Sequence, residues 1–307
     1  MPFITTDDDC DLYVKQWGPE GGKPVVLIHG WPLNADSWDD VANGLAEAGF
    51  KAIAYDRRGF GRSDQPWDGY DYDTLADDLA AVIEEFAEGQ QAAIAGFSMG
   101  GGEVARYLSR HGSEQISHAA LIASVVPFLL KTDDNPDGTD QAAFDEQIDQ
   151  IVDDRAVFMQ TFGKLFYGQG IIERPVSQGV LDHTFQMAML GGLRPTLACH
   201  RAFSMTDFRP DCAAFTIPTL IIHGGADKIV PAASSAHQAA KLIPHAQLIE
   251  LDGEPHGLLA TQKERVTQEL ITFLSGESRS AIGGGSEDAG TAQLYEAQAA
   301  PALNPTL

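Results

Sequence analysis

The chain has 307 residues, of which 44% are hydrophobic, which is enough for one large α/β domain with a sizeable core. Its 44 acidic and 20 basic residues give a formal net charge of −24, and such a field disfavours nucleic acid and anionic membranes as partners. No apolar run approaches the ~18 residues of a membrane-spanning helix, so we expect none.

The N-terminus and the cysteines predict a compartment. Residues 1–9 are acidic and lack the basic start and apolar core of a signal peptide. Cys10, Cys199 and Cys212 are odd in number and widely spaced, which predicts free thiols rather than a disulfide framework or a metal site. We therefore expect a cytoplasmic protein. The acidic charge is consistent either with a high-salt habitat or with an ordinary acidic enzyme.

Strand and helix patterns alternate along the first part of the chain, which predicts a mostly parallel sheet with helices on both faces. The expected strands are residues 11–17, 25–28, 51–55, 92–95, 118–122, 220–223 and 248–251, and the expected helices are residues 34–48, 72–88, 102–108 and 260–274.

The first parallel strand, residues 25–28, ends in His29-Gly30-Trp31-Pro32. We expect the backbone N–H of Trp31 to be one donor of an oxyanion hole. Pro32 fixes its own φ and so stiffens this loop, and we interpret His29 as hydrogen-bonded within it. In the loop of residues 56–66 no P-loop Lys-Ser/Thr pair follows the glycines, so we interpret Arg57, Arg58 and Arg62 as braces rather than as phosphate ligands.

The segment Gly96-Phe97-Ser98-Met99-Gly100 joins an expected strand to an expected helix. A G-x-S-x-G turn in this setting forces its serine into a strained conformation that exposes the hydroxyl, with the N-terminus of the helix aimed at the same place. We therefore predict Ser98 as a nucleophile and the N–H of Met99 as the second oxyanion donor.

The alternation breaks over residues 127–208, where the patterns are helical with no strand signal, and we interpret this segment as a helical cap inserted into a core of residues 1–126 and 209–275. Phe158, Phe162 and Phe166 recur at the spacing of one helix face. Most large apolar residues of the cap are expected to pack in its own core, whereas a small substrate pocket is expected to be lined by Pro32, Phe97, Phe128, Phe162 and Ile229.

A nucleophilic serine needs a base and an acid that orients the base. Asp227 follows the strand at residues 220–223, and His256 follows the strand at residues 248–251, in the order serine, acid, histidine. We assign His256 as the base and Asp227 as its partner. Asp252 is the rival acid, but we expect it to cap its own turn. Residues 276–307 are rich in Gly and Ala and predict a flexible tail, in which a partner-binding segment is the alternative.

Four segments carry a resemblance to a known group: residues 29–38 (HGWPLNADSW), 55–64 (YDRRGFGRSD), 96–102 (GFSMGGG) and 227–231 (DKIVP). Together they resemble the cofactor-free haloperoxidases, which lie in the α/β-hydrolase superfamily beside similar arylesterases and perhydrolases. The resemblance covers about residues 1–275 and is specific for the fold. It implies the same triad and oxyanion donors and a homo-oligomer, and Pro32 is typical of its haloperoxidase members.

The resemblance has one departure near the predicted base, where the charge of Glu254 would favour the protonated imidazole of His256 if the two came together. The expected activity is acyl transfer from small or aryl esters, with hydrogen peroxide as a co-substrate and a carboxylic acid as an alternative substrate. No cofactor is expected, because the chain lacks metal-ligand spacing and a dinucleotide fingerprint. A lactamase or amidase of the same fold and a non-catalytic binding protein remain as alternatives.

Overall fold

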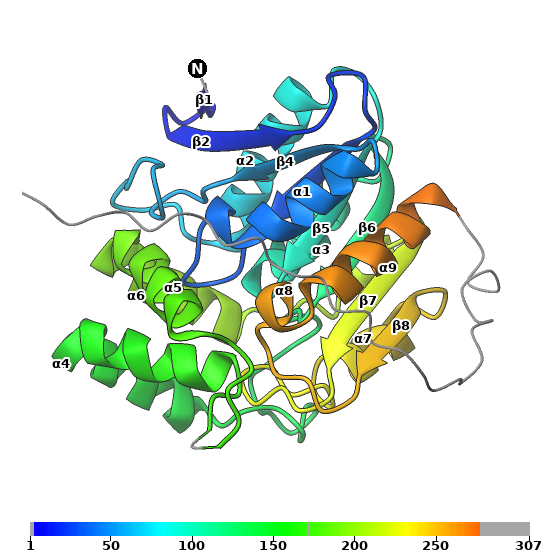
Figure 1. Cartoon of the computed structure of the whole chain (residues 1–307). Helices are drawn as coiled ribbons and strands as arrows, with labels where there is room; N and C mark the ends of the chain where they lie inside the picture. Colours follow the sequence, from blue (N-terminus) through cyan, green and yellow to red (C-terminus); the bar gives the residue numbers. More distant parts are fainter. Residues whose placement is uncertain (1–2, 171, 277–307) are drawn as a thin grey trace, which may run out of the picture.

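The computed structural model describes residues 3–170 and 172–276, and within them eight strands form one sheet in the order β1-β2-β4-β3-β5-β6-β7-β8 (Figure 1). The two pairs β1–β2 and β2–β4 are antiparallel, and every neighbouring pair from β4 to β8 is parallel. The expected α/β class with a mostly parallel sheet is confirmed. The strands are β1 Phe3–Thr5, β2 Asp11–Trp17, β3 Pro24–Ile28, β4 Lys51–Tyr55, β5 Ala92–Phe97, β6 Ile116–Ile122, β7 Thr219–Gly224 and β8 Gln247–Leu251.

The inner strands are apolar on both sides because helices cover both faces of the sheet. Val26 and Ile28 of β3 belong to the core cluster that contains residues of α2, α3 and α7. Val25 and Leu27 belong to the opposite cluster, with residues of α1 and α9. The helices of the core are α1 Asp39–Glu47, α2 Tyr72–Phe86, α3 Met99–His111, α7 Ala236–Leu242, α8 Leu258–Thr261 and α9 Lys263–Ser275, with 3-10 turns η1 Ala35–Trp38 and η2 Asp211–Ala214.

Two predicted helices differ in their first turns. The helix expected over residues 34–48 starts as the 3-10 turn η1, which Asn34 caps by accepting a hydrogen bond from the N–H of Asp36 at 3.0 Å. The closing helix expected over residues 260–274 is two helices, since the backbone leaves the helical region at Gln262 (φ −133°, ψ 34°).

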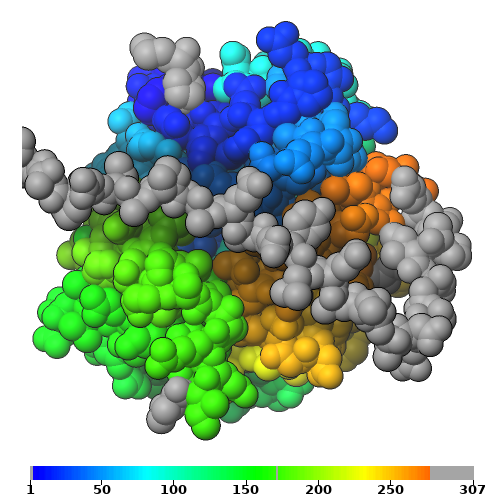
Figure 2. Space-filling view, viewed as in Figure 1, coloured from blue at the N-terminus to red at the C-terminus, as the bar shows by residue number. Residues whose placement is uncertain are grey.

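Helices α4 Gln141–Phe166, α5 Gln178–Leu190 and α6 Leu193–Met205 lie together at the end of the sheet where the parallel strands finish (Figure 1). In the space-filling view they form one body beside the rest of the molecule (Figure 2). The helical character predicted from residue 127 begins only at Gln141, because residues 127–140 form a loop closed by a bridge between Leu130 and Thr139. Within α4 the backbone of Asp154 is not helical. The predicted tail, residues 276–307, lies outside the described residues apart from Gly276.

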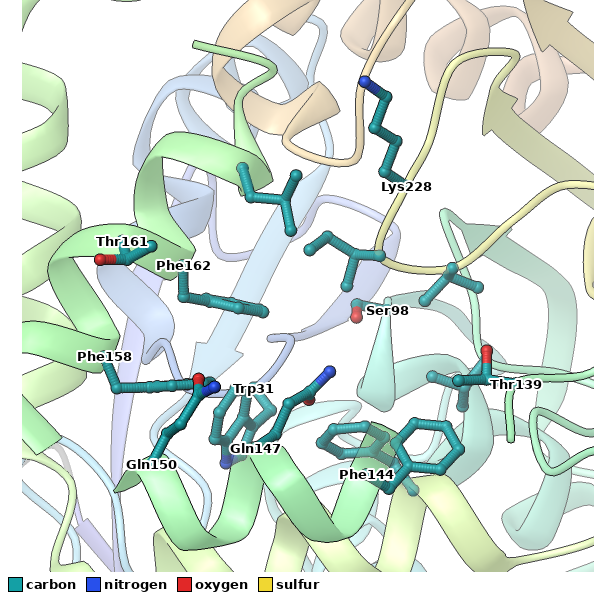
Figure 3. A pocket seen from close by; sticks show the side chains of 15 residues that line it. Trp31, Ser98, Thr139, Phe144, Gln147, Gln150, Phe158, Thr161, Phe162 and Lys228 are labelled. Carbon is teal, nitrogen blue, oxygen red and sulfur yellow. The ribbon is translucent and has the colours of Figure 1, made fainter. Parts of the chain in front are cut away.

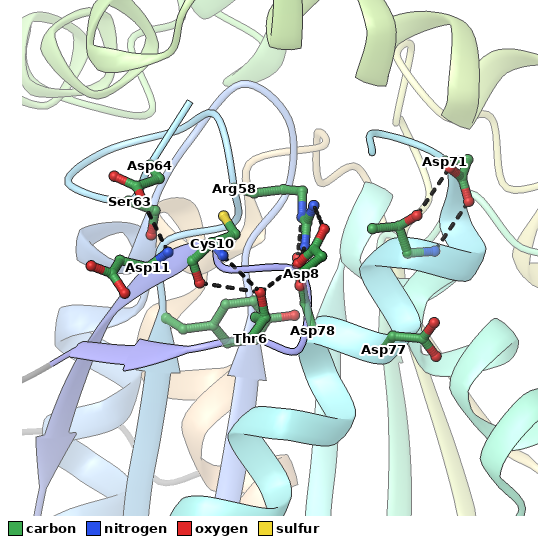
Figure 4. A network of polar contacts seen from close by, with 12 residues as sticks. Thr6, Asp8, Cys10, Asp11, Arg58, Ser63, Asp64, Asp71, Asp77 and Asp78 are labelled. Atoms are coloured by element: carbon green, nitrogen blue, oxygen red, sulfur yellow. Dashed lines mark hydrogen bonds and ion pairs between the residues drawn. The ribbon is translucent and has the colours of Figure 1, made fainter. Parts of the chain in front are cut away.

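The arginine-rich loop after β4 is held by carboxylates, which confirms the predicted bracing role. Arg58 donates to Asp78 of α2 at 2.6 and 2.7 Å and to both oxygens of Asp8 at 2.8 and 2.9 Å (Figure 4). Arg57 donates to Glu103 of α3 at 2.6 Å, and Arg62 to Asp56 at 2.7 Å. The loop, the N-terminal turn and two helices are therefore fastened together.

Candidate active site

Ser98 occupies the turn between β5 and α3 in a backbone conformation that L-residues rarely adopt (φ 54°, ψ −117°). Glycine neighbours make that turn possible. A Cβ on Gly96 would lie 2.4 Å from the carbonyl oxygen of Gly100, and a Cβ on Gly100 would lie 2.5 Å from that of Ile28. The G-x-S-x-G spacing is thus a steric requirement of this turn.

His256 lies within hydrogen-bonding distance of Ser98. Its Nε2 is 2.9 Å from Ser98 Oγ, and its Nδ1 is 2.6 Å from Asp227 Oδ2. The imidazole is buried between the rings of Phe97 and Phe166, whose centroids are 5.3 and 4.8 Å away. Three residues from the ends of β5, β7 and β8 therefore form one hydrogen-bonded chain.

Asp227 is fixed in place by its own loop. Its Oδ1 accepts hydrogen bonds from the N–H groups of Ile229 and Val230, both at 2.8 Å, and its Oδ2 lies 3.4 Å from His223 Nε2. Burial alone would raise the pKa of this carboxyl. The charge of His256 and the hydrogen bonds from both histidines outweigh burial and hold the pKa well below its usual value. Asp227 is therefore ionised near neutral pH.

Among the described residues, neither of the two acidic residues that shortly precede His256 in sequence is a hydrogen-bond partner of its imidazole. Asp252 is exposed in the turn after β8, so the structure brings Asp227 rather than this rival to the imidazole. The carboxylate of Glu254 accepts a hydrogen bond from Gln262 Nε2 at 2.7 Å.

The predicted oxyanion donors flank Ser98 along two segments. Met99 begins α3, and Trp31 follows β3 in the loop whose Gly30 approaches Ser98 so closely that a Cβ on it would lie 2.9 Å from that of the serine. Among the hydrogen bonds of the described residues, neither N–H group has an acceptor. The Trp31 indole donates to the carbonyl of Thr196 at 3.0 Å, which joins this loop to helix α6.

His29 is hydrogen-bonded within the same loop, as predicted. Its Nδ1 lies 2.9 Å from the carbonyl oxygen of Gly30, and its Nε2 accepts the N–H of Arg57 at 2.9 Å. Burial, together with the charge of Arg57, lowers its pKa well below the usual value, so the ring is neutral.

Ser98 opens onto a cavity of about 250 Å³ between the sheet and α4 (Figure 3). Its walls are largely aromatic and aliphatic, with a few polar side chains. The lining residues are Trp31, Ser98, Val125, Thr139, Phe144, Gln147, Gln150, Phe158, Thr161, Phe162, Leu165, Phe203, Lys228, Ile229 and Val230. A space of this kind suits a small, mainly apolar molecule held by few polar contacts.

Of the five residues predicted to line the pocket, Phe162 and Ile229 do so. Phe97, Phe128 and Pro32 are not among the lining residues. Phe97 is buried behind the site against Trp38, Phe166 and His256, because a residue inside the sheet end is covered on all sides. Phe128 lies under the guanidinium of Arg209, 5.0 Å from its ring centroid. Pro32 is buried in its loop, after a cis peptide bond.

The prediction missed the polar part of the lining, notably Gln147. A signal was present, since Gln147 stands three residues after Phe144 and so on the same face of its helix. In residues 3–170 and 172–276 no group of three or more His, Cys, Asp or Glu side chains could hold a metal ion. No described helix has the length and apolar character to cross a membrane. The three cysteines are buried and free.

Comparisons with known proteins agree with this fold. The family model for the α/β hydrolase fold matches residues 23–157. The chain is 43% identical to a putative non-heme chloroperoxidase of Synechocystis, over 89% of this chain and 100% of that one. It is 38% identical to a bifunctional esterase/perhydrolase of Acinetobacter calcoaceticus, over 89% and 99%.

Among solved structures, a bromoperoxidase from Bacillus anthracis superposes with a TM-score of 0.84 at 40% identity, over 89% of this chain and 99% of that one. The likeness thus extends over most of this chain and nearly all of the bromoperoxidase. This chain therefore belongs to the α/β-hydrolase family, in the branch that contains the non-heme haloperoxidases.

Proposed function

We propose that the chain is a serine hydrolase that transfers the acyl group of small or aryl esters to water and to hydrogen peroxide. The observation that carries this proposal is the hydrogen-bonded chain from Ser98 through His256 to Asp227 at the wall of the apolar cavity. The names of similar proteins, a chloroperoxidase and an esterase/perhydrolase, support both acceptors.

In the first half of the reaction Ser98 Oγ attacks the ester carbonyl while its proton passes to His256 Nε2. The negative charge that develops on the carbonyl oxygen is stabilised by the N–H groups of Trp31 and Met99, which are free to donate. Asp227 keeps the imidazole in the tautomer that accepts the proton and stabilises its charged form. The C–O bond breaks, and the alcohol leaves with the proton from His256.

In the second half a water molecule gives a proton to His256 and attacks the acyl-enzyme, releasing the carboxylic acid and restoring Ser98. When hydrogen peroxide takes the place of water, the same steps release a peroxy acid. In solution the peroxy acid oxidises bromide to hypobromous acid and is itself reduced to the carboxylate. Halide oxidation by this route proceeds outside the active site.

The Ser98→Ala variant tests this proposal. We expect hydrolysis of p-nitrophenyl acetate to fall by about 10⁴–10⁶. Bromination in the presence of acetate and peroxide is expected to fall with it, because both reactions use one acyl-enzyme. Ser109→Ala makes the same change on the exposed side of α3 and is expected to keep both activities. Equal turnover by parent and Ser98→Ala would contradict the proposal.

We further propose that residues 127–208 act as a cap, since α4 supplies most of the side chains opposite Ser98. A cytoplasmic location is supported by the three buried, free cysteines. Assembly as a homo-oligomer stays a prediction.

A further inference from the structure

Apart from Ser98 and Trp31, one polar side chain of the cavity wall has a buried hydrogen-bond partner among the described residues. Gln147 of α4 lies with its Oε1 2.8 Å from Nε2 of His200, a residue of α6 that is 0% exposed. By contrast, Gln150 is exposed and donates to Glu146 at 3.2 Å along the same helix. Gln147 is thus the lining amide with a buried partner.

His200 has one role available toward that amide, which is to donate a hydrogen bond to its oxygen. Rings of Trp31, Phe144 and Phe203 surround it, with centroids 5.4, 6.1 and 4.9 Å away. Burial, aided by the charge of Arg201, lowers the pKa of His200 to about 4, so near neutral pH it carries a single N–H. Its Nδ1 is buried without a partner among the described residues.

A buried N–H without an acceptor is rarer in proteins than an unused acceptor. The proton of His200 therefore belongs on Nε2, where it is donated to Gln147 Oε1. This bond occupies the oxygen of the amide, and the NH₂ group is left to face the cavity. In Figure 3 the amide nitrogen of Gln147 points into the cavity, on the side where Ser98 lies.

We propose that Gln147, oriented by His200, is the specificity-determining polar anchor of this cavity. It donates hydrogen bonds to an ether, hydroxyl or carbonyl oxygen carried by the substrate beyond the reacting ester group. The preferred substrates are then small esters with such an oxygen, rather than plain hydrocarbon esters of the same size. This inference rests on the proposed esterase function, because it concerns the substrate of the same site.

The test compares esters that differ by one atom. In one series an oxygen replaces the β-methylene or the γ-methylene in the acyl chain of p-nitrophenyl pentanoate. In a second series butyl acetate is compared with 2-methoxyethyl acetate by titration of the acid released. The quantity measured is the ratio of kcat/KM for the oxygen-containing ester to that for its hydrocarbon counterpart. Comparing this ratio between enzymes cancels the intrinsic reactivity of each ester.

For the best-placed oxygen we expect Gln147→Leu to lower this ratio by about three- to tenfold, the worth of one hydrogen bond. The matched control is Gln160→Leu, which makes the same change on the exposed side of α4 and should leave the ratio unchanged. A ratio that stays within twofold for every pair in Gln147→Leu overturns the inference.

His200→Phe separates positioning from packing. If His200 orients the amide, this variant lowers the same ratio, and the double variant with Gln147→Leu lowers it no further. If His200 is only structural, all esters lose activity alike and the ratio is kept, which overturns its assigned role. Should His200→Phe fail to fold, Gln147→Leu still decides the anchor. Absence of any Ser98-dependent hydrolysis in the parent would overturn the proposed function itself and this inference with it.

Discussion

Both oxygens of the Asp227 carboxylate have partners of different kinds. One accepts two backbone N–H groups of its own loop, and the other faces His256 and, at 3.4 Å, His223. The two hydrogen bonds from the loop orient the carboxylate independently of the histidines. In the proposed mechanism Asp227 has two tasks, which are to set the tautomer of His256 and to balance its charge.

The Asp227→Asn variant is expected to lower kcat for p-nitrophenyl acetate by about 10⁴, because an amide N–H facing Nδ1 would favour the wrong tautomer of His256. Asp252→Asn is the matched control at the exposed rival acid and should leave kcat within about twofold. Similar losses in the two variants, measured at matched folding by circular dichroism, would contradict the assignment of Asp227.

The buried ion pair of Arg57 and Glu103 joins three secondary-structure segments around the site. Glu103 of α3 accepts hydrogen bonds from Arg57 at 2.6 Å and from Tyr55 of β4 at 2.7 Å, and Arg57 donates to the carbonyl of His29 at 2.6 Å. Helix α3, the central sheet and the loop that carries Trp31 are thereby linked next to the proposed nucleophile Ser98.

Glu103→Ala leaves the fully buried guanidinium of Arg57 without its counter-charge. We expect the free energy of unfolding to fall by about 3–5 kcal/mol, measured by urea denaturation. Glu85→Ala removes an exposed glutamate of α2 and should cost less than about 0.5 kcal/mol. A loss for Glu103→Ala no larger than for Glu85→Ala would show that this ion pair does not stabilise the fold.

The N-terminal turn is fastened to the arginine loop by a pair that depends on pH. Hydrogen bonds from Arg58 lower the pKa of Asp8 to about 2, despite an opposing contribution from burial. The folded protein thus binds this proton less readily than the unfolded chain, so the pair stabilises the fold above about pH 4 and loses this effect as the pH falls toward 2.

Asp8→Asn is accordingly expected to lower Tm at pH 7, with a deficit that shrinks as the pH is lowered from about 5 to 3. Thermal unfolding of parent and variant across this range is the measurement. Asp7→Asn, next to it and exposed, serves as the control with no such trend. A deficit independent of pH would mean that the Asp8 carboxylate is not what holds the turn.

The sequence predicts the elements that carry strong local signals. Ser98 sits in a turn that only glycine neighbours allow, and Asp227 and His256 follow apolar strands, so chain order sufficed to bring them together in the prediction. The strand β1, with three residues, and the helix α7, with fewer than two full turns, were not predicted, since each is too short to show the periodicity of its own type. The predicted list of residues lining the pocket was partly wrong, for a different reason. Phe97 and Phe128 are large and apolar, and such residues fill any core site equally well.

The whole molecule carries a formal charge of −24, which its ion pairs do not remove. Self-repulsion on this scale destabilises the compact state and is screened by salt over a Debye length of about 30 Å at 0.01 M and about 10 Å at 0.1 M.

We therefore expect Tm to rise as NaCl increases from about 0.01 to 0.1 M, measured by differential scanning fluorimetry. A continued rise toward about 1 M would favour the high-salt habitat, and a plateau would favour an ordinary acidic enzyme. No rise at any concentration would contradict the role assigned to self-repulsion.

The hydrogen bond from the Trp31 indole to Thr196 has a consequence for how such enzymes can diversify. Through this bond the position of the loop that carries a proposed oxyanion donor depends on α6. The loop and the helices are therefore not independent modules that could be exchanged separately. A helical segment transplanted from a relative would have to bring a carbonyl to the same point, or the graft would fold and still leave the loop unsupported. The substrate range of this chain is then more readily altered by single residues of the cavity wall than by exchange of the whole segment.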